Sequence, residues 1–293
     1  MQYDFAIVGG DQRQVYLANY LKNRRYQVIL YGTEKKDLDP GCRQAESFLE
    51  AIMNADNIIG PIVFSKDDIS LTSPKDEKEL LLEEFLAKIK KRQSVFGGCI
   101  SDMVRKRCVK KGVEVYDFMK MDDVAVFNAI ATAEGAIVKA MELKPINLHG
   151  SHCLVLGYGR CAKVLADKLK GLKAKVTVCA RSEIAKSQCT AFGLDCLGFD
   201  SLERCILRYD YIFNTVPALV LKYPELKRMA KDACIIDIAS APGGVDREAA
   251  KKLGVQAYLC PSLPGIYAPK SSGIRLAQKV LELKGRDDDG VRK

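Results

Sequence analysis

The chain has 293 residues, enough for two domains of ordinary size, each with its own hydrophobic core. Its composition is 48% hydrophobic and 28% charged, which is typical of a soluble globular protein, and no uninterrupted apolar run approaches the ~18 residues of a membrane span. The formal net charge of +9 raises the question of nucleic-acid binding, but the basic clusters at 88–92 and 105–111 carry no interleaved aromatic residues, so we expect solvated helix faces.

The chain begins MQYDFAIVGGDQRQ, with an acid and no basic n-region, so we expect a first strand there and not a signal peptide. Eleven cysteines without an export signal indicate reduced thiols in a cytoplasm. The cysteines form no CxxC pair, and there are only two histidines, so the sequence predicts no metal site. We therefore expect a cytoplasmic protein, and we expect it to form a homo-oligomer.

Residues 1–123 alternate predicted strands and helices, the pattern of a parallel, doubly wound α/β sheet. The strands are expected at residues 4–10, 27–31, 55–64, 94–100 and 113–116. The first strand ends in GGDQRQ, which lacks GxG spacing and places charged side chains where a pyrophosphate would lie, so we assign this loop to the substrate. Asp11 and Arg13 either contact the ligand, or Asp11 only caps the following helix.

Residues 124–144 are predicted to form a long, largely apolar helix between the two domains. It carries Asn128, Thr132 and Glu134 among small and aliphatic side chains, and buried polar groups need partners. A carboxylate on this helix either faces the ligand as a proton acceptor or only accepts bonds from backbone donors. All three residues are therefore candidate catalytic residues.

Residues 145–285 are predicted to form a Rossmann NAD(P)-binding domain. The segment 150–181 runs as strand, glycine turn, helix and strand, the order that a dinucleotide-binding βαβ unit requires. Gly157 allows the tight turn, Gly159 lets the backbone approach a pyrophosphate, and Ala162 is small enough for helix and strand to pack. The helix start offers N–H groups and a positive dipole end; a glycine turn without a ligand is the alternative. The cofactor contacts predicted here are Gly157, Tyr158, Gly159, Arg160, Cys161 and Ala162.

The end of the second strand of this unit bears on the identity of the cofactor. A carboxylate there would bind the ribose 2′-hydroxyl of NAD, but this chain has Arg181 and Ser182, with Lys186 one turn further. An arginine forms forked, charge-assisted bonds to a phosphate, and a hydroxyl adds another. The sequence therefore favours NADP over NAD, and the alternative is a solvated arginine.

Three further strands are expected at 209–216, 233–239 and 256–259, and each ends in a loop with Pro or Gly. Ligands bind at the carboxyl ends of strands in such sheets, so we expect these loops to surround the nicotinamide half of the cofactor; otherwise they are only rigid connections. The candidates are Thr215, Val216, Pro217, Ala239 and Leu263 for the cofactor, and Ser240 and Lys270 for the substrate. A last helix is expected at 274–283, with Ser272 at its start, and residues 286–293 are predicted to be a disordered tail.

Seven segments then occur in a fixed order: VGGDQRQ, VAVFNAIATAEGAI, HGSHCLVLGYGR, CARS, NTVPALV, DIASAPGGVD and LPGIYAPKSSG. With these segments the chain resembles the A subunits of dipicolinate synthase from endospore-forming bacteria. It departs from them in Ala162, where relatives often have a third glycine, and in its charge of +9. The resemblance implies NADP-dependent oxidation of dihydrodipicolinate to dipicolinate on a branch of lysine biosynthesis. It also implies a partner, the flavoprotein B subunit, together with expression in the mother cell during sporulation.

The reaction that the resemblance implies would pass a hydride from a cyclic dicarboxylate to the nicotinamide and a proton to a base. Because the ring becomes aromatic, the protein mainly has to position donor and acceptor. The proton acceptor would be Glu134 or a lysine with a lowered pKa. The candidate partners of the two substrate carboxylates are Lys270, Arg13, Thr132 and Ser240.

Three other functions stay open at this point. A shikimate-dehydrogenase-like or hydroxyacid reductase that uses NADP would have the same two-domain plan. A non-catalytic, redox-sensing regulator would bind NADP without turnover. Nucleic-acid binding would be recognised by a steep loss of affinity with salt.

Overall fold

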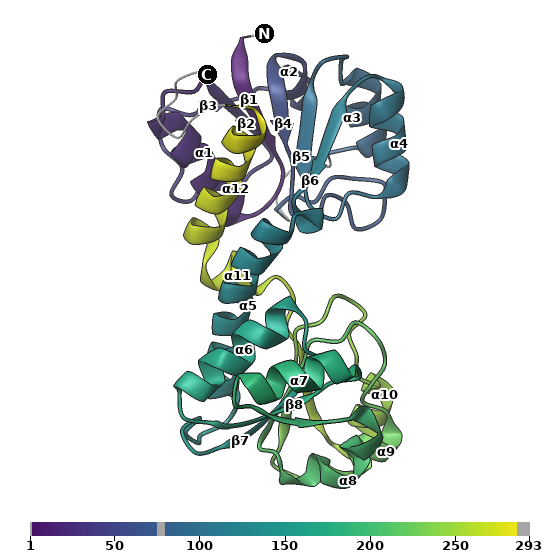
Figure 1. Cartoon of the computed structure of the whole chain (residues 1–293). Helices are drawn as coiled ribbons and strands as arrows, with labels where there is room; N and C mark the ends of the chain where they lie inside the picture. The colour runs from purple at the N-terminus through teal and green to yellow at the C-terminus, as the bar shows by residue number, and fades with distance from the viewer. Residues whose placement is uncertain (1, 75–79, 286–293) are drawn as a thin grey trace. The chain divides into compact units, whose positions relative to one another are not determined.

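The computed structural model describes residues 2–74 and 80–285, and the chain divides into two compact units. The first unit contains Met1–Phe127 and Ala268–Lys293, and the second contains Asn128–Tyr267. Each unit holds a six-stranded sheet, and all pairs of named strands are parallel (Figure 1). The predicted α/β class with two parallel sheets is confirmed.

The sheet of the first unit has the strand order β3-β2-β1-β4-β5-β6. Its strands are β1 (Tyr3–Val8), β2 (Val28–Tyr31), β3 (Arg43–Gln44), β4 (Ala55–Ile59), β5 (Ser94–Gly97) and β6 (Glu114–Asp117). Its helices are α1 (Gln12–Asn23), α2 (Phe48–Met53), α3 (Leu82–Lys88), α4 (Asp102–Lys110) and α12 (Pro269–Leu283).

Both faces of this first sheet are covered by helices, because alternate residues of a strand point to opposite faces. Ala6 and Val8 of β1 belong to a core with residues of α2, α3 and α4. Phe5 and Ile7 belong to a second core with residues of α1 and α12. The unit is therefore doubly wound, as predicted from the alternation of its elements.

The last helix, α12, corrects the predicted domain plan, which assigned it to the Rossmann domain of residues 145–285. Its buried residues Leu276, Ala277, Val280 and Leu281 pack in the first unit with residues of α1. The apolar spacing of a helix identifies its buried face but not the sheet that the face covers, so the sequence could not make this assignment. The predicted tail, 286–293, lies outside the described residues.

The helix predicted at 124–144 is α5 (Asp122–Leu143), and the boundary between the two units falls within it. By length and composition alone α5 could cross a membrane, with a mean hydropathy of 1.4, but 56% of its most apolar window is buried inside the protein. Ala133, Ala136, Ile137 and Ala140 belong to the core of the second unit. Its apolar character is thus that of a core helix.

The sheet of the second unit has the strand order β12-β11-β10-β7-β8-β9. Its strands are β7 (His152–Leu156), β8 (Lys175–Cys179), β9 (Asp195–Leu197), β10 (Tyr211–Asn214), β11 (Cys234–Asp237) and β12 (Gln256–Leu259). Its helices are α6 (Arg160–Gly171), α7 (Glu183–Ala191), α8 (Leu202–Cys205), α9 (Tyr223–Arg228), α10 (Arg247–Leu253) and α11 (Leu263–Tyr267). The strand order reverses between the neighbours β7 and β10, and in such sheets ligands bind beyond the carboxyl ends of the strands at this point.

Candidate functional site

The glycine turn after β7 is built by close contact with the neighbouring strand end. Gly157 has a φ of +93°, and a β-carbon there would lie 2.6 Å from Thr215 Oγ1 and 3.0 Å from Val216 Cγ2. The Gly157 N–H donates to the carbonyl of Cys179 at 2.8 Å, and the Thr215 hydroxyl donates to the carbonyl of Leu156 at 2.8 Å. Only glycine fits this position, and the turn brings the predicted residues Thr215 and Val216 against it.

The start of α6 is open and has no side-chain cap. Gly159 is the N-cap residue and its side-chain position is empty, because a β-carbon there would meet no atom within 4 Å. Ala162, one turn into the helix, is fully buried in the core against the sheet. An exposed helix start with bare amides and a positive dipole end fits the diphosphate of a dinucleotide.

Thr132 of α5 lies against the first turn of α6. Burial raises the pKa of the Cys161 thiol, while a hydrogen bond with Thr132 acts in the opposite direction. The Thr132 hydroxyl also donates to the carbonyl of Asn128 at 2.9 Å. The Thr132 side chain therefore reaches the first turn of the helix that follows the glycine turn.

The loop after β8 and the first turn of α7 hold the three residues predicted to bind a 2′-phosphate. The Ser182 hydroxyl accepts a bond from the Ala185 N–H and caps α7. The pKa of Lys186 is raised because its Nζ donates to the Glu183 carboxylate at 2.7 Å. Arg181 is exposed, and no acid within residues 2–74 and 80–285 forms an ion pair with it. Arg181 is the one of the three whose charge is left for a ligand.

The loops after β10 and β11 are fixed by two buried polar side chains that the sequence interpretation missed. Asn214 donates to Asp237 Oδ1 at 2.8 Å and to the carbonyl of Val216 at 3.1 Å. Asp237 also accepts the N–H of Ala239 at 3.2 Å and that of Gly244 at 2.9 Å. A polar residue at the end of an otherwise apolar, buried strand was the signal in both cases. These bonds hold the backbone of residues 214–217 and 237–244 in place at the strand ends.

The remaining predicted contacts of these loops differ in exposure. Pro217 and Ser240 are exposed, and the Ser240 carbonyl accepts the N–H of Gly243 in a tight turn. Ala239 is 5% exposed, next to Asp237. Leu263 is 2% exposed and belongs to the core of the unit, where it lies near Gly135 of α5. Leu263 is thus a packing residue in this structure.

Glu134 lies on an exposed side of α5 and forms an ion pair with Lys168 of α6, Nζ to Oε1 2.8 Å. Lys168 is eight residues past the start of α6, a distance of about 12 Å along a helix. The structure therefore does not bring the Glu134 carboxylate to the glycine turn.

Arg13 and Lys270 belong to the first unit. The Arg13 guanidinium is buried and forms an ion pair with Asp11 at 2.7 Å. Asp11 is the N-cap of α1 and accepts the backbone N–H of Arg13 at 3.0 Å, so of the two roles considered for Asp11 the structure shows capping. Lys270 is exposed in the first turn of α12, which begins at Pro269 and so contradicts the predicted start at Ser272.

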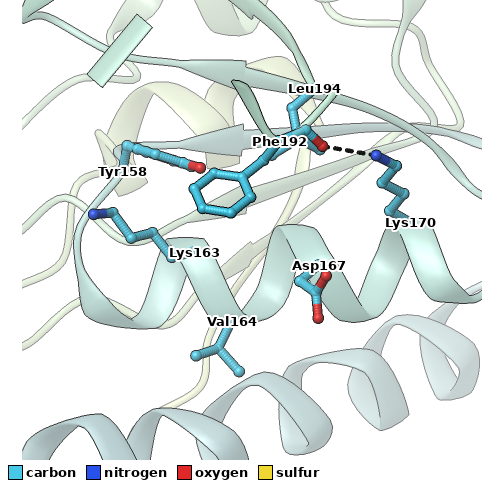
Figure 2. A pocket seen from close by; sticks show the side chains of 7 residues that line it. All are labelled: Tyr158, Lys163, Val164, Asp167, Lys170, Phe192 and Leu194. Atoms are coloured by element: carbon cyan, nitrogen blue, oxygen red, sulfur yellow. Dashed lines mark hydrogen bonds between the residues drawn. The ribbon is translucent and has the colours of Figure 1, made fainter. Parts of the chain in front are cut away.

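A cavity of about 310 Å³ opens beside α6. Figure 2 shows Phe192 lying over α6, with Tyr158 and Lys163 toward one end and Lys170, which donates to the Phe192 carbonyl at 2.7 Å, toward the other. Burial and two neighbouring cysteines raise the pKa of Tyr158. The side chain of Tyr158 thus points into this cavity, and only its backbone is part of the glycine turn.

Comparison with known proteins agrees with this geometry. Residues 4–119 match the family model of the N-terminal domain of the dipicolinate synthase A subunit, and residues 123–252 match that of the D-isomer specific 2-hydroxyacid dehydrogenase, NAD binding domain. The chain is 31% identical over 285 residues to the A subunit of dipicolinate synthase of Bacillus subtilis (strain 168), and the match covers 95% of this chain and 94% of the relative.

Two solved structures are similar over nearly the whole chain. The A chain of dipicolinate synthase from Bacillus subtilis has a TM-score of 0.85 at 28% identity, and the match covers 97% of this chain and 96% of that one. The A subunit of dipicolinate synthase from Bacillus halodurans has a TM-score of 0.87 at 29% identity, and the match covers 98% and 100%. These findings confirm the resemblance drawn from the seven segments, and the second unit is a pyridine-nucleotide-binding domain of the dehydrogenase type.

Proposed function

The chain belongs to the family of dipicolinate synthase A subunits, and from this premise we propose that it oxidises dihydrodipicolinate to dipicolinate, pyridine-2,6-dicarboxylate, with NADP as the hydride acceptor. The observation that supports the proposal most directly is the open, uncapped helix start behind Gly157 and Gly159 in an NAD-type domain. When bound, the nicotinamide supplies the oxidising power, and aromatisation of the substrate ring makes the reaction favourable.

Each part of the glycine-turn site has a role in holding this cofactor. Gly159 and the first amides of α6 would bind the diphosphate. Arg181 would bind the 2′-phosphate with its guanidinium. The hydrogen bond between Asn214 and Asp237 would keep the loops after β10 and β11 rigid, so that little conformational entropy is lost when the cofactor binds. Thr132, beside the first turn of α6, would orient the substrate end.

For the substrate we propose Arg13, Lys270, Thr132 and Ser240 as partners of the two carboxylates. For the proton we propose Glu134 or a lysine with a lowered pKa as the acceptor; Glu134 would first have to exchange its bond to Lys168. A Glu134→Gln variant with unchanged turnover would remove Glu134 from this role.

We further propose that the partner is a flavoprotein B subunit, that the chain assembles into a homo-oligomer, and that it acts in the cytoplasm of the mother cell during sporulation. The relatives are described as one lettered subunit of a synthase, which supports the existence of another. The test of the function is an assay of NADPH formation from freshly generated dihydrodipicolinate, with the chain alone and with the B subunit. No NADPH in either case would refute the proposal.

The choice of NADP over NAD is tested by Arg181→Ala. Because charge-assisted bonds to the 2′-phosphate are lost, NADP should bind about 10- to 100-fold more weakly, while NAD affinity stays within about twofold. The matched control is Arg208→Ala, an exposed arginine in the short turn Ile206–Arg208 that precedes the amino end of β10. Isothermal titration calorimetry with both nucleotides measures the change. An equal loss for both nucleotides, or no loss, would contradict NADP preference through Arg181.

A second candidate is an NADP-dependent reductase of a 2-hydroxy or 2-oxo acid, favoured by the match of residues 123–252 to the NAD binding domain of 2-hydroxyacid dehydrogenases. Reduction or oxidation of one or more such acids, without oxidation of dihydrodipicolinate, would support this second candidate.

A further inference from the structure

The first turns of α1 and α12 lie against one another in the first unit, and Figure 1 shows the two helices running side by side. Gly273 of α12 is a point of close approach. A β-carbon there would clash with the carbonyl oxygen of Arg13 and would lie 3.1 Å from the backbone nitrogen of Leu17. The start of α12 is therefore held against the start of α1, at the end of the sheet where β1 finishes.

Arg13, whose carbonyl oxygen faces Gly273, carries a rigid, buried guanidinium. Its Nε donates to Asp11 Oδ1 at 2.9 Å and its Nη2 donates to Asp11 Oδ2 at 2.7 Å. These bonds fix the plane of the group, and Nη1 takes part in none of them. An arginine held in this way keeps one N–H edge for a second carboxylate, which is the geometry that a guanidinium binds best.

Ser272, which precedes Gly273 at this helix junction, carries an unpaired hydroxyl. It is 1% exposed, and its Oγ is buried without a hydrogen-bond partner. Ser272 lies one turn before Leu276, which packs in the core shared with α1, so both face α1. In a helix the Cα–Cβ bond is tilted toward the N-terminus, so this hydroxyl points back to the first turn of α12. A buried, unpaired hydroxyl is costly unless a ligand completes it.

The start of α12 adds a positive field. The helix has 15 residues, its N-cap Ala268 makes no side-chain cap bond, and its first turn has no acid but carries Lys270. The free amides, the dipole of a long helix and the lysine charge all favour a bound anion.

We propose that Arg13, Ser272 and the first turn of α12 form a binding site for one carboxylate of a planar, pyridine-type dicarboxylate. The inference rests on the proposed function, because it assigns to this site a carboxylate of that function's substrate and product. Arg13 Nη1 and Ser272 Oγ donate to the carboxylate, and the amides of Lys270 and Ser271 complete its shell. Asp11 is the positioning residue, since it orients the guanidinium without touching the ligand.

The test compares two serines of the full chain. Ser272→Ala removes the buried hydroxyl, and Ser187→Ala removes an exposed one from α7 of the second unit and serves as the control. Calorimetry with pyridine-2,6-dicarboxylate should show binding about tenfold weaker for Ser272→Ala and unchanged for Ser187→Ala. Without ligand, Ser272→Ala should unfold at the same or a higher denaturant concentration, because it loses an unpaired group. Unchanged ligand affinity in Ser272→Ala would overturn the proposal.

A second variant and a second probe separate this inference from the proposed function. Arg13→Lys keeps the charge but loses the fork, so it should also bind at least about tenfold more weakly, with circular dichroism confirming the fold. Benzene-1,3-dicarboxylate has the same spacing of carboxylates without the pyridine nitrogen. Binding of this probe that depends on Ser272, in a chain that does not oxidise dihydrodipicolinate, would support the site and refute the function. Oxidation whose KM is the same in Ser272→Ala would support the function and refute the site.

Discussion

The two units each place a glycine turn after a central strand, and only one of these turns is open. In the first unit the Gly10 N–H donates to the carbonyl of Thr72 at 2.7 Å, and a β-carbon at Gly9 would lie 2.5 Å from that same oxygen. In the second unit a β-carbon at Gly159 would meet no atom within 4 Å. The same local motif is thus filled by the protein's own chain in one unit and free in the other.

The difference teaches what a glycine turn needs in order to bind an anion. At the start of α1, Asp11 accepts the N–H of Arg13, and Gln14 Oε1 accepts the N–H of Asp11 at 3.0 Å. These amides already donate to the chain's own side chains, so they are not free to bind an anion. At the start of α6 the N-cap is Gly159, which has no side chain to do this. Glycines alone do not make a phosphate site; a helix start without its own cap does.

The largest effect is expected from placing a carboxylate at the N-cap of α6, where α1 already has Asp11. Gly159→Asp places a carboxylate where the diphosphate would bind, and a like-charge contact costs several kcal/mol, so nucleotide affinity should fall on the order of 1,000-fold. Folding should be unaffected, because the position is open. Gly171→Asp, at the other end of α6 and equally open, is the control and should keep its affinity. Calorimetry with NADP measures both, and an affinity retained in Gly159→Asp would disprove the site.

A substitution in the first turn should lower the stability of the fold, because this turn is already filled by the chain itself. Gly10 has a φ of +91°, and a β-carbon there would clash with the side chain of Gln14, so Gly10→Ala should lower the free energy of unfolding by about 2–4 kcal/mol. Gly150→Ala separates the two causes, because Gly150 has a φ of +78° but no atom within 4 Å, and should cost only about 1 kcal/mol. Urea denaturation measures both. Equal losses in the two variants would show that the contact with Gln14 contributes nothing.

Much of the fold could be predicted because strands and helices alternate with clear apolar spacing. The strands expected at 94–100 and 256–259 are β5 and β12, and Ser101 caps α4 by accepting the Val104 N–H. The short helices α2, α9 and α10 were missed, since a helix of six or seven residues spans fewer than two turns and gives little periodicity to recognise.

The candidate site was predictable where a residue's role depends on its own backbone or on its place at the end of a strand. Gly157 needs a positive φ, and the sequence GYG indicates such a turn. The bond between Asn214 and Asp237 joins residues 23 positions apart, and the ion pair of Glu134 with Lys168 joins two helices, so neither could be predicted from local pattern. For the same reason the position of Ser272 near the start of α1 depends on which unit α12 covers, which its sequence does not specify.

The smallest effect is expected from removing the charge of Asp11, the residue that caps the first turn of α1. Burial tends to raise the pKa of Asp11, but the hydrogen bonds and charge of Arg13 outweigh it and hold the pKa below its ordinary value. A carboxyl with a lowered folded pKa stabilises the protein above its unfolded pKa, near 4, and loses that contribution as the pH falls through the folded value.

Asparagine is also a good N-cap, so Asp11→Asn removes the charge and keeps the cap. The Asp11 side chain is 42% exposed, and solvent screening limits the expected loss to about 1 kcal/mol at pH 7. Urea denaturation of both proteins from pH 7 downward should show this difference shrinking below about pH 4, because protonated Asp11 is as neutral as asparagine. Asp102→Asn, an acid in the first turn of α4, is the control. A difference that stays constant as the pH falls would mean that the charge of Asp11 is not what closes this turn.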